Sequence, residues 1–501
     1  MDIHPRRSEF EAVYAAGKAQ VVWAELAADL DTPVSIMLKL GQDRRFSALL
    51  ESVEGGAVRG RYSFIALDPD LVWRCHGQVA EMCRTIGDGP LQYAKEPDPT
   101  LTSLRALVAA SRITLPEHLP PMAAGLIGYM GYDTIRLVEN IPDKNPDSIG
   151  IPDGMFMRPT VIVIFDNVND IMTIVTPVYP AAGTDGAAAY ADATGRIHGL
   201  MTALERPVPH LAPATTMRFD EAVSNIGRDG YHEMVLKAKE YILAGDIFQV
   251  VPSQRFRLPF ALPAFSLYRS LRRLNPSPFL FHLSFDGFAI VGSSPEILVR
   301  LREGKVTIRP LAGTRPRGKT KAEDEALAAE LLADPKERAE HLMLLDLGRN
   351  DVGRVCKAGT VKVTEQMVIE RYSHVMHVVS NVEGDIAPGY DAMDALMAGF
   401  PAGTVSGAPK VRAMEIIDEL ETERRTFYGG AIGYLSANGD MDTCIALRTA
   451  LVKDGEVIIQ AGGGVVVDSD PEAEFQESNN KAKALVDAAK EAVRFFAGGN
   501  R

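Results

Sequence analysis

Two pairs of glutamates, far apart along the chain, are the residues of this sequence whose type and spacing most directly suggest chemistry. Glu337 and Glu340 form the first pair, and Glu474 and Glu477 form the second. A spacing of three places both carboxylates of a pair on one face of a helix. If the two faces meet, four carboxylates converge, and a hard dication such as Mg²⁺ would neutralise them. Because Mg²⁺ keeps some water and takes further ligands from an anionic substrate, the pattern indicates a metal-assisted reaction on a small acid.

The helices that carry these glutamates have recognisable starts. Asp334-Pro335 and Asp470-Pro471 each read as an N-cap followed by proline at the first helical position. Both pairs then fall in a first helical turn, where the helix dipole favours anions. An isolated glutamate pair is usually a solvated helix face. At this point two interpretations are open, namely two solvated faces stabilised by the dipole and one shared metal site.

Length and composition restrict the class of protein. The chain has 501 residues, 46% of them hydrophobic, a net charge of −13 and a pI near 5.4, so it can bury a large core. No basic run stands out, which argues against a nucleic-acid partner. No apolar run approaches the roughly 18 residues of a membrane span, and no signal-peptide core follows the start. The four cysteines lack metal-ligand spacing. We expect them to be reduced and the protein to be cytoplasmic, with no membrane partner.

The chain reads as two segments of mixed secondary structure. Residues 181–216 are rich in Ala, Gly and Pro and contain one predicted helix, at 185–204, so we predict an N-terminal segment at 1–180, a linker at 181–216 and a catalytic segment at 217–501. Apolar runs at 34–40 and 160–165 predict strands. The periodicity also predicts helices at 101–108 and after a cap at Asp229.

Five local sequences are too unusual to be explained by packing alone. They are RPLAGTRPRG (309–318), LDLGRNDVGRV (345–355), RYSHVMH (371–377), GTVSGAPK (403–410) and AGGGVVVDSDP (461–471). Together and in this order they resemble the chorismate-binding enzymes, most closely the large subunits of anthranilate synthases. The resemblance is strong over 229–488 and weaker before it, where LLES (49–52) and GRYSFI (60–65) carry it. It implies an α+β fold, with antiparallel sheets in a sandwich-like core, surrounding helices, and both segments in one compact unit.

The resemblance implies that the substrate is chorismate, a dicarboxylate, and that the cofactor is Mg²⁺. Glu340 and Glu477 match the direct ligands of the metal, with Glu337 and Glu474 beside them through water. Arg448 matches an arginine that holds the other carboxylate, where a planar fork suits bidentate contact. The remaining implied substrate contacts are Gly313, Thr314, Thr404, Tyr428, Gly462, Gly463, Gly464 and Lys481.

The implied reaction has two steps. Ammonia adds to carbon 2 of the ring while the carbon 4 hydroxyl leaves, and the aminodeoxyisochorismate intermediate then loses pyruvate and a proton to give anthranilate. His377 matches the catalytic histidine and would act as a general acid on the departing hydroxyl. A lone histidine is more often structural, so this role rests on the resemblance. Gly463 stands where relatives usually have alanine.

Two positions separate this chain from other members of the family. Aminodeoxychorismate synthases carry a nucleophilic lysine where this chain has Ala312, which cannot form a covalent bond to the ring. Isochorismate-forming relatives use a lysine as general base where this chain has Gln249, and glutamine cannot deprotonate water. Both positions favour anthranilate formation. The large subunit of aminodeoxychorismate synthase and a non-catalytic tryptophan-sensing subunit remain the alternatives.

The source of ammonia is expected to be another protein. None of the four cysteines stands on a glycine-flanked turn of the kind that a glutamine amidotransferase needs. We therefore expect a separate amidotransferase subunit and a hetero-oligomer.

The resemblance also implies feedback inhibition by tryptophan. The residues that match its site are Leu50, Glu51, Ser52, Pro278, Phe279 and Leu280. Many relatives have Tyr-Met in place of Phe279-Leu280. The ordinary interpretation of these two stretches is a strand end and a proline-rich turn.

Overall fold

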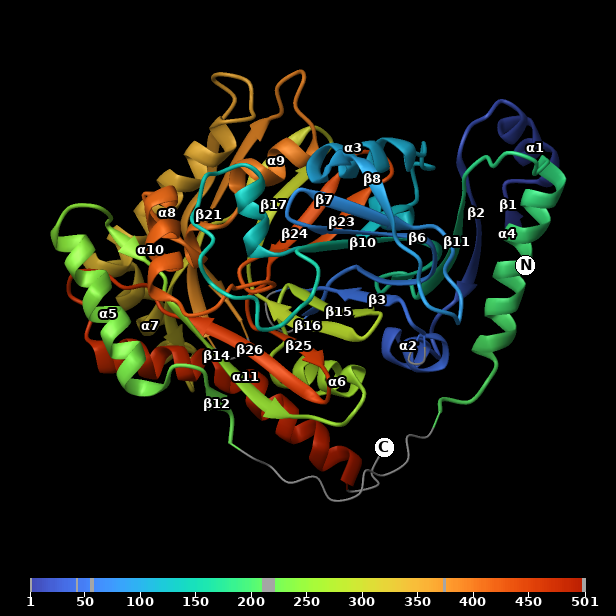
Figure 1. Ribbon diagram of the computed structural model, residues 1–501. Helices are drawn as coiled ribbons and strands as arrows, with labels where there is room; N and C mark the ends of the chain where they lie inside the picture. The colour runs from blue at the N-terminus through green and yellow to red at the C-terminus, as the bar shows by residue number, and fades with distance from the viewer. Residues whose placement is uncertain (1, 42–43, 55–57, 210–220, 373–374, 498–501) are drawn as a thin grey trace.

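The fold is described from a computed structural model of the chain, which covers residues 2–41, 44–54, 58–209, 221–372 and 375–497 (Figure 1). Helices surround a central mass of strands. The helices are α1 (Arg7–Ala15), α2 (Pro33–Leu40), α3 (Thr100–Ala110), α4 (Gly186–Leu204), α5 (Gly227–Leu243), α6 (Ala264–Leu274), α7 (Lys321–Ala333), α8 (Pro335–Gly353), α9 (Ala392–Gly399), α10 (Lys410–Leu420) and α11 (Pro471–Ala497), with 3₁₀ turns η1 (Pro121–Ala123), η2 (Tyr132–Leu137) and η3 (Gly403–Val405).

The strands occur throughout both halves of the sequence. In the first half they are β1 (Ile3–His4), β2 (Gln20–Ala27), β3 (Ser47–Glu51), β4 (Val53–Glu54), β5 (Val58–Arg59), β6 (Tyr62–His76), β7 (Val79–Cys83), β8 (Ala94–Pro99), β9 (Gly125–Met130), β10 (Gly154–Asp166) and β11 (Ile171–Val178). In the second half they are β12 (Val223–Ser224), β13 (Gln249–Val250), β14 (Ser253–Pro259), β15 (Phe279–Phe285), β16 (Phe288–Ser294), β17 (Ile297–Arg302), β18 (Lys305–Ile308), β19 (Leu311–Pro316), β20 (Lys362–Arg371), β21 (Val375–Asp385), β22 (Gly407–Ala408), β23 (Ala431–Ser436), β24 (Met441–Ile445), β25 (Thr449–Lys453) and β26 (Glu456–Gly462).

The two long strands β6 and β10 pair along most of their length and hold two arms of antiparallel sheet together. One arm continues from β6 through β3, β15, β16, β25 and β26 to β14. The other continues from β10 through β9, β23, β24, β17 and β18 to β21. The expected antiparallel α+β fold is therefore confirmed.

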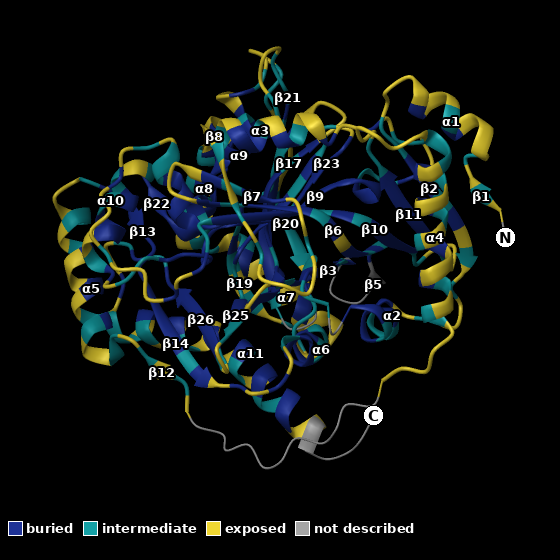
Figure 2. Ribbon diagram, turned by 45° about the vertical axis from the view of Figure 1, so that its right-hand side comes forward, coloured by how far each residue is buried: buried dark blue, intermediate teal, exposed yellow. Residues whose placement is uncertain are grey.

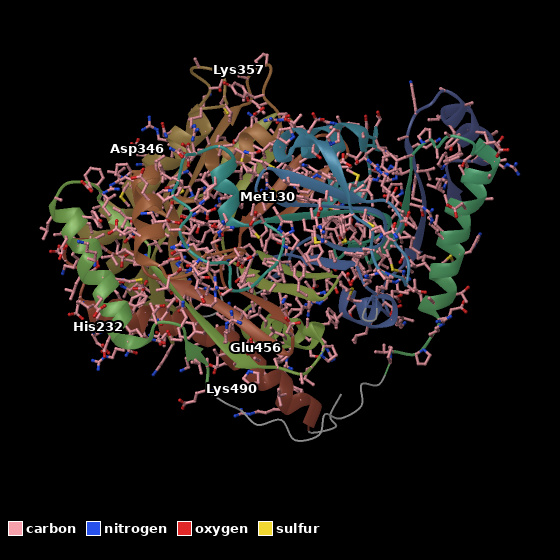
Figure 3. All side chains as sticks on the ribbon, in the orientation of Figure 1. Met130, His232, Asp346, Lys357, Glu456 and Lys490 are labelled. Carbon is pink, nitrogen blue, oxygen red and sulfur yellow. The ribbon has the colours of Figure 1, made fainter. Side chains whose placement is uncertain are left out.

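Each arm joins strands from the first half of the sequence to strands from the second half. β3 pairs with β15, with Leu280 opposite Glu51, and β9 pairs with β23, with Tyr129 opposite Ile432. Met130 at the end of β9 lies in the middle of the side-chain mass (Figure 3). Residues of both halves thus share three hydrophobic core clusters, as expected of one compact unit, and Figure 2 shows the buried strands inside a half-exposed shell of helices. The boundaries at 180 and 216 stay a prediction, and the structure leaves 210–220 undescribed.

Local signals predicted some elements well. Asp334 caps α8, because its carboxylate accepts hydrogen bonds from the backbone N–H groups of Lys336 and Glu337, and Asp470 accepts one from Ala473 at the start of α11. The predicted helix at 185–204 is α4, and the predicted helix at 101–108 is α3.

Two expectations were wrong. The run at 34–40 is the helix α2, because Thr32 caps it with Ser35 in a capping box and proline stands at its first position. A short apolar run does not separate helix from strand by itself. Asp229 lies inside the first turn of α5 and is not its cap. Among the described residues, no helix has the length and apolar character needed to cross a membrane.

Candidate active site

Gly462, Gly463 and Gly464, at the end of β26 and directly after it, form a turn that we refer to as the glycine turn. This turn brings the backbone close to side chains from α8, α11 and β13. A Cβ on Gly463 would lie 2.7 Å from Oε2 of Glu474. A Cβ on Gly464 would lie 2.2 Å from Nε2 of Gln249 and 3.7 Å from Oε1 of Glu340. A Cβ at either position would require the end of the Glu474 or the Gln249 side chain to shift. The turn therefore allows three distant parts of the chain to meet.

All four predicted carboxylates lie around this turn or near it. Gly313, on β19, has its Cα hydrogen directed at Glu337, since a Cβ there would be 3.1 Å from Oε2 of Glu337. The charges of Glu337 and Glu477 both act on Glu340 and raise its pKa further, beyond the larger effect of burial. Each carboxylate has a protein partner, in the pairs Arg315–Glu337 (3.1 Å), Gln249–Glu340 (3.1 Å), Ser469–Glu474 (2.7 Å) and Lys481–Glu477 (2.7 Å).

The carboxylates carry negative charge that these partners do not fully compensate. Burial raises the pKa of Glu340 and of Glu474, and Oε2 of Glu474 is buried without a hydrogen-bond partner in the described part of the chain. Within the described ranges, no three Asp, Glu, His or Cys side chains are close enough to enclose a metal ion. Oxygen ligands with uncompensated charge nevertheless suit Mg²⁺ when a substrate supplies further ligands. The donor set therefore fits the predicted metal.

His377 lies on β21, directly opposite Thr314 of β19. Its Nδ1 is 2.9 Å from the carbonyl oxygen of Gly313 and 3.1 Å from the Thr314 hydroxyl. A carbonyl oxygen only accepts, so Nδ1 carries the proton and Nε2 is left as an acceptor. Burial lowers the pKa of His377 to about 4. The imidazole is therefore neutral at pH 7, and the predicted general-acid role would need a proton that the free protein does not hold.

Arg448 supplies positive charge to the same site. The residue has φ +47°, and its guanidinium makes no hydrogen bond or ion pair with any residue that the structure describes. Burial lowers the pKa of Arg448, and its charge in turn disfavours protonation of His377. A desolvated guanidinium without an acid beside it is costly unless a ligand provides the negative charge. Arg448 therefore marks a position for an anion.

Tyr428 and Lys481 meet at the first glycine of the turn. Lys481 Nζ donates to the carbonyl oxygen of Gly462 at 3.0 Å. Burial raises the pKa of Tyr428 to about 12, and a backbone hydrogen bond from Gly462 opposes this rise. The ring of Tyr428 also faces the guanidinium of Arg425, 5.5 Å from its centroid. Both predicted substrate contacts are thus held beside the turn.

Glu296 is a candidate functional residue that the sequence reading missed. It lies between β16 and β17, is fully buried, and accepts a hydrogen bond of 2.8 Å from the hydroxyl of Thr404, a predicted substrate contact. Its second oxygen has no partner among the described residues. Burial raises the pKa of Glu296 to about 8, so the carboxyl group holds a proton at neutral pH. The sequence signal that could have revealed Glu296 is a glutamate between two short apolar runs that become strands.

Arg315 was also missed. It bonds Glu337 and Asp334 at 3.1 and 2.9 Å and so fixes the first turn of α8 against β19. Ala312 and Gln249, the two residues expected to exclude rival chemistries, lie on β19 and β13. Ala312 is a buried apolar residue of β19, and Gln249 contacts Glu340 through its amide nitrogen.

The six residues of the predicted regulatory site, Leu50, Glu51, Ser52, Pro278, Phe279 and Leu280, all line one cavity of about 1090 Å³. The carboxylate of Glu51 is occupied, because Arg272 donates to both of its oxygens at 2.6 and 2.9 Å and the Tyr268 hydroxyl donates to one. Glu296 and Tyr372 line the same cavity. The cavity therefore extends from the β3–β15 pair to Glu296 and Tyr372.

Comparison with known proteins agrees with this geometry. The sequence profile of the family described as chorismate binding enzyme matches residues 68–487. The chain is 58% identical to anthranilate synthase component 1 of Cereibacter sphaeroides, over 97% of both chains, and 47% identical to that of Pseudomonas putida, over 96% of this chain and 97% of the relative.

Among solved structures, anthranilate synthase component I from Streptococcus pneumoniae TIGR4 superposes with a TM-score of 0.74 at 36% identity, covering 92% of this chain and 99% of the other. The match in sequence and the match in fold extend over nearly the whole length. This chain therefore belongs to the chorismate-binding enzymes, together with the anthranilate synthase component 1 proteins.

Proposed function

We propose that this enzyme converts chorismate and ammonia to anthranilate and pyruvate with the help of Mg²⁺. The observation that carries the proposal is the separation of charge around the glycine turn. Arg448 has no acid partner among the described residues. Burial raises the pKa of Glu340 and Glu474, whose hydrogen-bond partners are the neutral Gln249 and Ser469. A substrate with two carboxylates satisfies both, one by direct contact with the guanidinium and one through a shared dication. Chorismate, a dicarboxylate, has this distribution of charge.

The metal would be held by Glu340 and Glu477, with Glu337 and Glu474 beside them. When bound, Mg²⁺ would neutralise the ring carboxylate and stabilise the negative charge that develops as the ring rearranges. Lys481, which bonds Glu477 at 2.7 Å in the free protein, would be released to contact substrate. The glycine turn would present backbone N–H groups to the same carboxylate.

Proton transfer can be assigned to two side chains, of which one can donate a proton and the other can accept one before the reaction starts. Glu296 holds a proton at neutral pH and would give it to the departing carbon 4 hydroxyl, which would leave as water. His377 is neutral with a free lone pair on Nε2 and is suited to take a proton from the ammonium group formed at carbon 2. Loss of the carbon 2 hydrogen and of pyruvate then makes the ring aromatic. The predicted general-acid role of His377 is the alternative.

The ammonia would come from a separate glutamine amidotransferase subunit. Burial raises the pKa of the thiols of Cys75 and Cys444, and that of Cys356 to about 11, so none of these three is an activated nucleophile. The name component 1 that the relatives carry also implies a second component.

Tryptophan would inhibit by binding in the cavity of about 1090 Å³ between β3 and β15. Its indole would contact Phe279 and Leu280, and Ser52 would hydrogen-bond its polar end. Since Arg272 and Tyr268 already hold Glu51, this acid would shape the pocket instead of pairing with the ligand. The cavity wall shared with Glu296 gives a direct route by which the occupied pocket affects catalysis.

The reaction itself is tested with the purified chain, chorismate, Mg²⁺ and ammonium at about pH 8.5. We expect anthranilate, which is detected by its fluorescence. After Mg²⁺ is chelated we expect no product, because the ring carboxylate of the substrate would then face the glutamate carboxylates without a cation to neutralise them. Chromatography identifies the product. Aminodeoxychorismate or isochorismate in place of anthranilate would contradict the assignment drawn from Ala312 and Gln249.

The metal ligands are tested by Glu340→Gln and Glu477→Gln. Each variant removes a negative oxygen ligand, so we expect the Mg²⁺ concentration for half-maximal rate to rise by about tenfold or more and kcat to fall. Glu472→Gln, in the first turn of α11 but paired with Arg228 and His232, is the matched control and should behave like the unaltered chain. Full Mg²⁺-dependent turnover in both variants would show that the metal lies elsewhere.

The proton donor is tested by Glu296→Gln, which keeps the shape and the Thr404 hydrogen bond but cannot give a proton. We expect kcat to fall by about 10²–10⁴-fold. Because the free carboxyl group has a pKa of about 8, kcat/KM at constant free ammonia should fall as pH rises through 8, and the variant should lack this limb. Glu365→Gln, an exposed acid of the same cavity, is the control. A rate within a few-fold of normal would exclude Glu296 as the donor.

The regulatory pocket is tested by Ser52→Ala. Loss of one hydrogen bond to a buried polar group should raise the tryptophan concentration for half inhibition by about tenfold and leave the uninhibited rate unchanged. Ser284→Ala, on β15 but outside the cavity lining, serves as control. Unaltered inhibition in both variants would remove Ser52 from the site.

A further inference from the structure

The antiparallel pairing of β14 with β26 is interrupted at the glycine turn and then resumes. The paired stretch ends with Ser253 opposite Gly462, and an isolated bridge joins Val250 to Val465, three residues further along each strand. Because the number of residues between these two points is the same on both sides, the register does not change. The two strands therefore separate at the glycine turn and meet again without an extra residue in either of them.

Pro252 lies opposite Gly463 in this register. Val250 and Val465 exchange both of their backbone hydrogen bonds, at 2.8 and 3.2 Å. Since hydrogen-bonded pairs alternate along an antiparallel ladder, the next such pair would be Pro252 and Gly463. Proline has no N–H to donate, and among the described residues the N–H of Gly463 makes no direct bond to the carbonyl oxygen of Pro252. Both hydrogen bonds of a regular pair are therefore missing at this position.

The hydroxyl of Tyr231 occupies the place of the missing bonds. It accepts a hydrogen bond from the N–H of Gly463 at 3.3 Å and donates one to the carbonyl oxygen of Pro252 at 3.4 Å. Tyr231 lies on α5, is 0% exposed, and belongs to the hydrophobic cluster that also contains both residues of the isolated bridge. Figure 3 marks this part of α5 with His232, the next residue. Packing thus fixes the ring, and its hydroxyl keeps Gly463 apart from Pro252.

This separation matters because the glycine turn contacts the proposed metal site. A Cβ on Gly463 would lie 2.7 Å from Oε2 of Glu474, and a Cβ on Gly464 would lie 3.7 Å from Oε1 of Glu340. The N–H of Gly464 has no acceptor in the described part of the chain. Without the tyrosine hydroxyl, the N–H of Gly463 would be free to bond Pro252 directly. The turn would then shift toward Pro252 and lose its present distances to the two carboxylates.

We propose that Tyr231 is a positioning residue, whose hydroxyl holds the glycine turn open for a carboxylate of the substrate. This inference rests on the proposed function, in which the turn contacts chorismate. The Tyr231 hydroxyl is buried and already bonded to two backbone groups, so it takes no part in making or breaking bonds of the substrate. Tyr231 therefore determines how tightly the substrate is held, and the rate of the bound substrate depends on other groups.

The hydroxyl is removed by Tyr231→Phe, which keeps the ring and its packing. We expect the KM for chorismate to rise by about tenfold or more, while kcat for ammonia-dependent anthranilate formation stays within about threefold. The Kd for chorismate, measured by calorimetry with Mg²⁺ and without ammonium, should rise in parallel with KM. Tyr241→Phe removes a hydroxyl from the same helix, one that bonds Glu419, and is the matched control that should leave both constants unchanged.

A crystal structure of Tyr231→Phe tests the inference without relying on activity. We expect the backbone nitrogen of Gly463 to lie within hydrogen-bond distance of the carbonyl oxygen of Pro252. A turn that keeps its present place, with or without a water at the position of the lost hydroxyl, would overturn the proposal. A KM and a Kd for chorismate within about twofold of those of the unaltered chain would also overturn it, even if the melting temperature falls, because Tyr231 would then act only in packing.

If Tyr231→Phe does not fold, as judged by circular dichroism, Pro252→Ala decides the outcome. The new N–H would complete a regular hydrogen-bonded pair with Gly463, so this variant should also close the gap and raise the KM for chorismate. An unchanged KM would overturn the proposal. If the unaltered chain neither binds chorismate nor forms anthranilate, the proposed function fails, and the position of the turn in the variant's crystal structure still decides the role of Tyr231.

Discussion

Charge held out of water around the glycine turn is the constraint on which the rest of this structure depends. Glu340 and Glu474 are desolvated acids, and Arg448 is a desolvated base without an acid partner in the described residues. Neutralising them against one another would stabilise the free protein and abolish the site. The fold instead keeps them apart by placing them on different elements, α8, α11 and the segment between β24 and β25. Keeping these charges apart costs free energy of folding. Packing elsewhere in the molecule must offset this cost, and the hydrophobic core of both sheet arms is the source.

Strands of the first half of the sequence pair with strands of the second half, and this pairing extends the core through both halves. Because β3 pairs with β15 and β9 with β23, neither half of the sequence has a complete sheet of its own. The same pairing puts Leu50 and Leu280 in the wall of a cavity that also contacts Glu296. The cavity thus lies against the sheet arm that joins β3 and β15, and Glu296 forms part of its lining.

The parts of this arrangement that follow from local chemistry could be predicted from the sequence. The caps at Asp334 and Asp470, and the placement of Glu337 and Glu474 in first turns with Glu340 and Glu477 one turn further on, needed only neighbouring residues. Helix α2 was misread because its short apolar run fits either structure and the capping box at Thr32 was not weighed. Glu296 was missed because its raised pKa arises from burial between β16 and β17, a property of the folded chain and not of its spacing. The lowered pKa of His377 likewise arises from burial in the folded chain, and the carbonyl oxygen of Gly313 on a neighbouring strand fixes its proton on Nδ1.

The shared sheet has a consequence for how such a protein changes over generations. A regulatory unit that is fused to a catalytic one as a separate domain can be lost or exchanged by a single recombination event. Here the strands beside Ser52 and those beside Glu296 belong to one sheet, so cutting the chain between them would leave unpaired strand edges on both fragments. Sensitivity to an inhibitor bound in this cavity would therefore change by point substitution and could not be lost as a separate module, so control by such an inhibitor would be inherited together with catalysis.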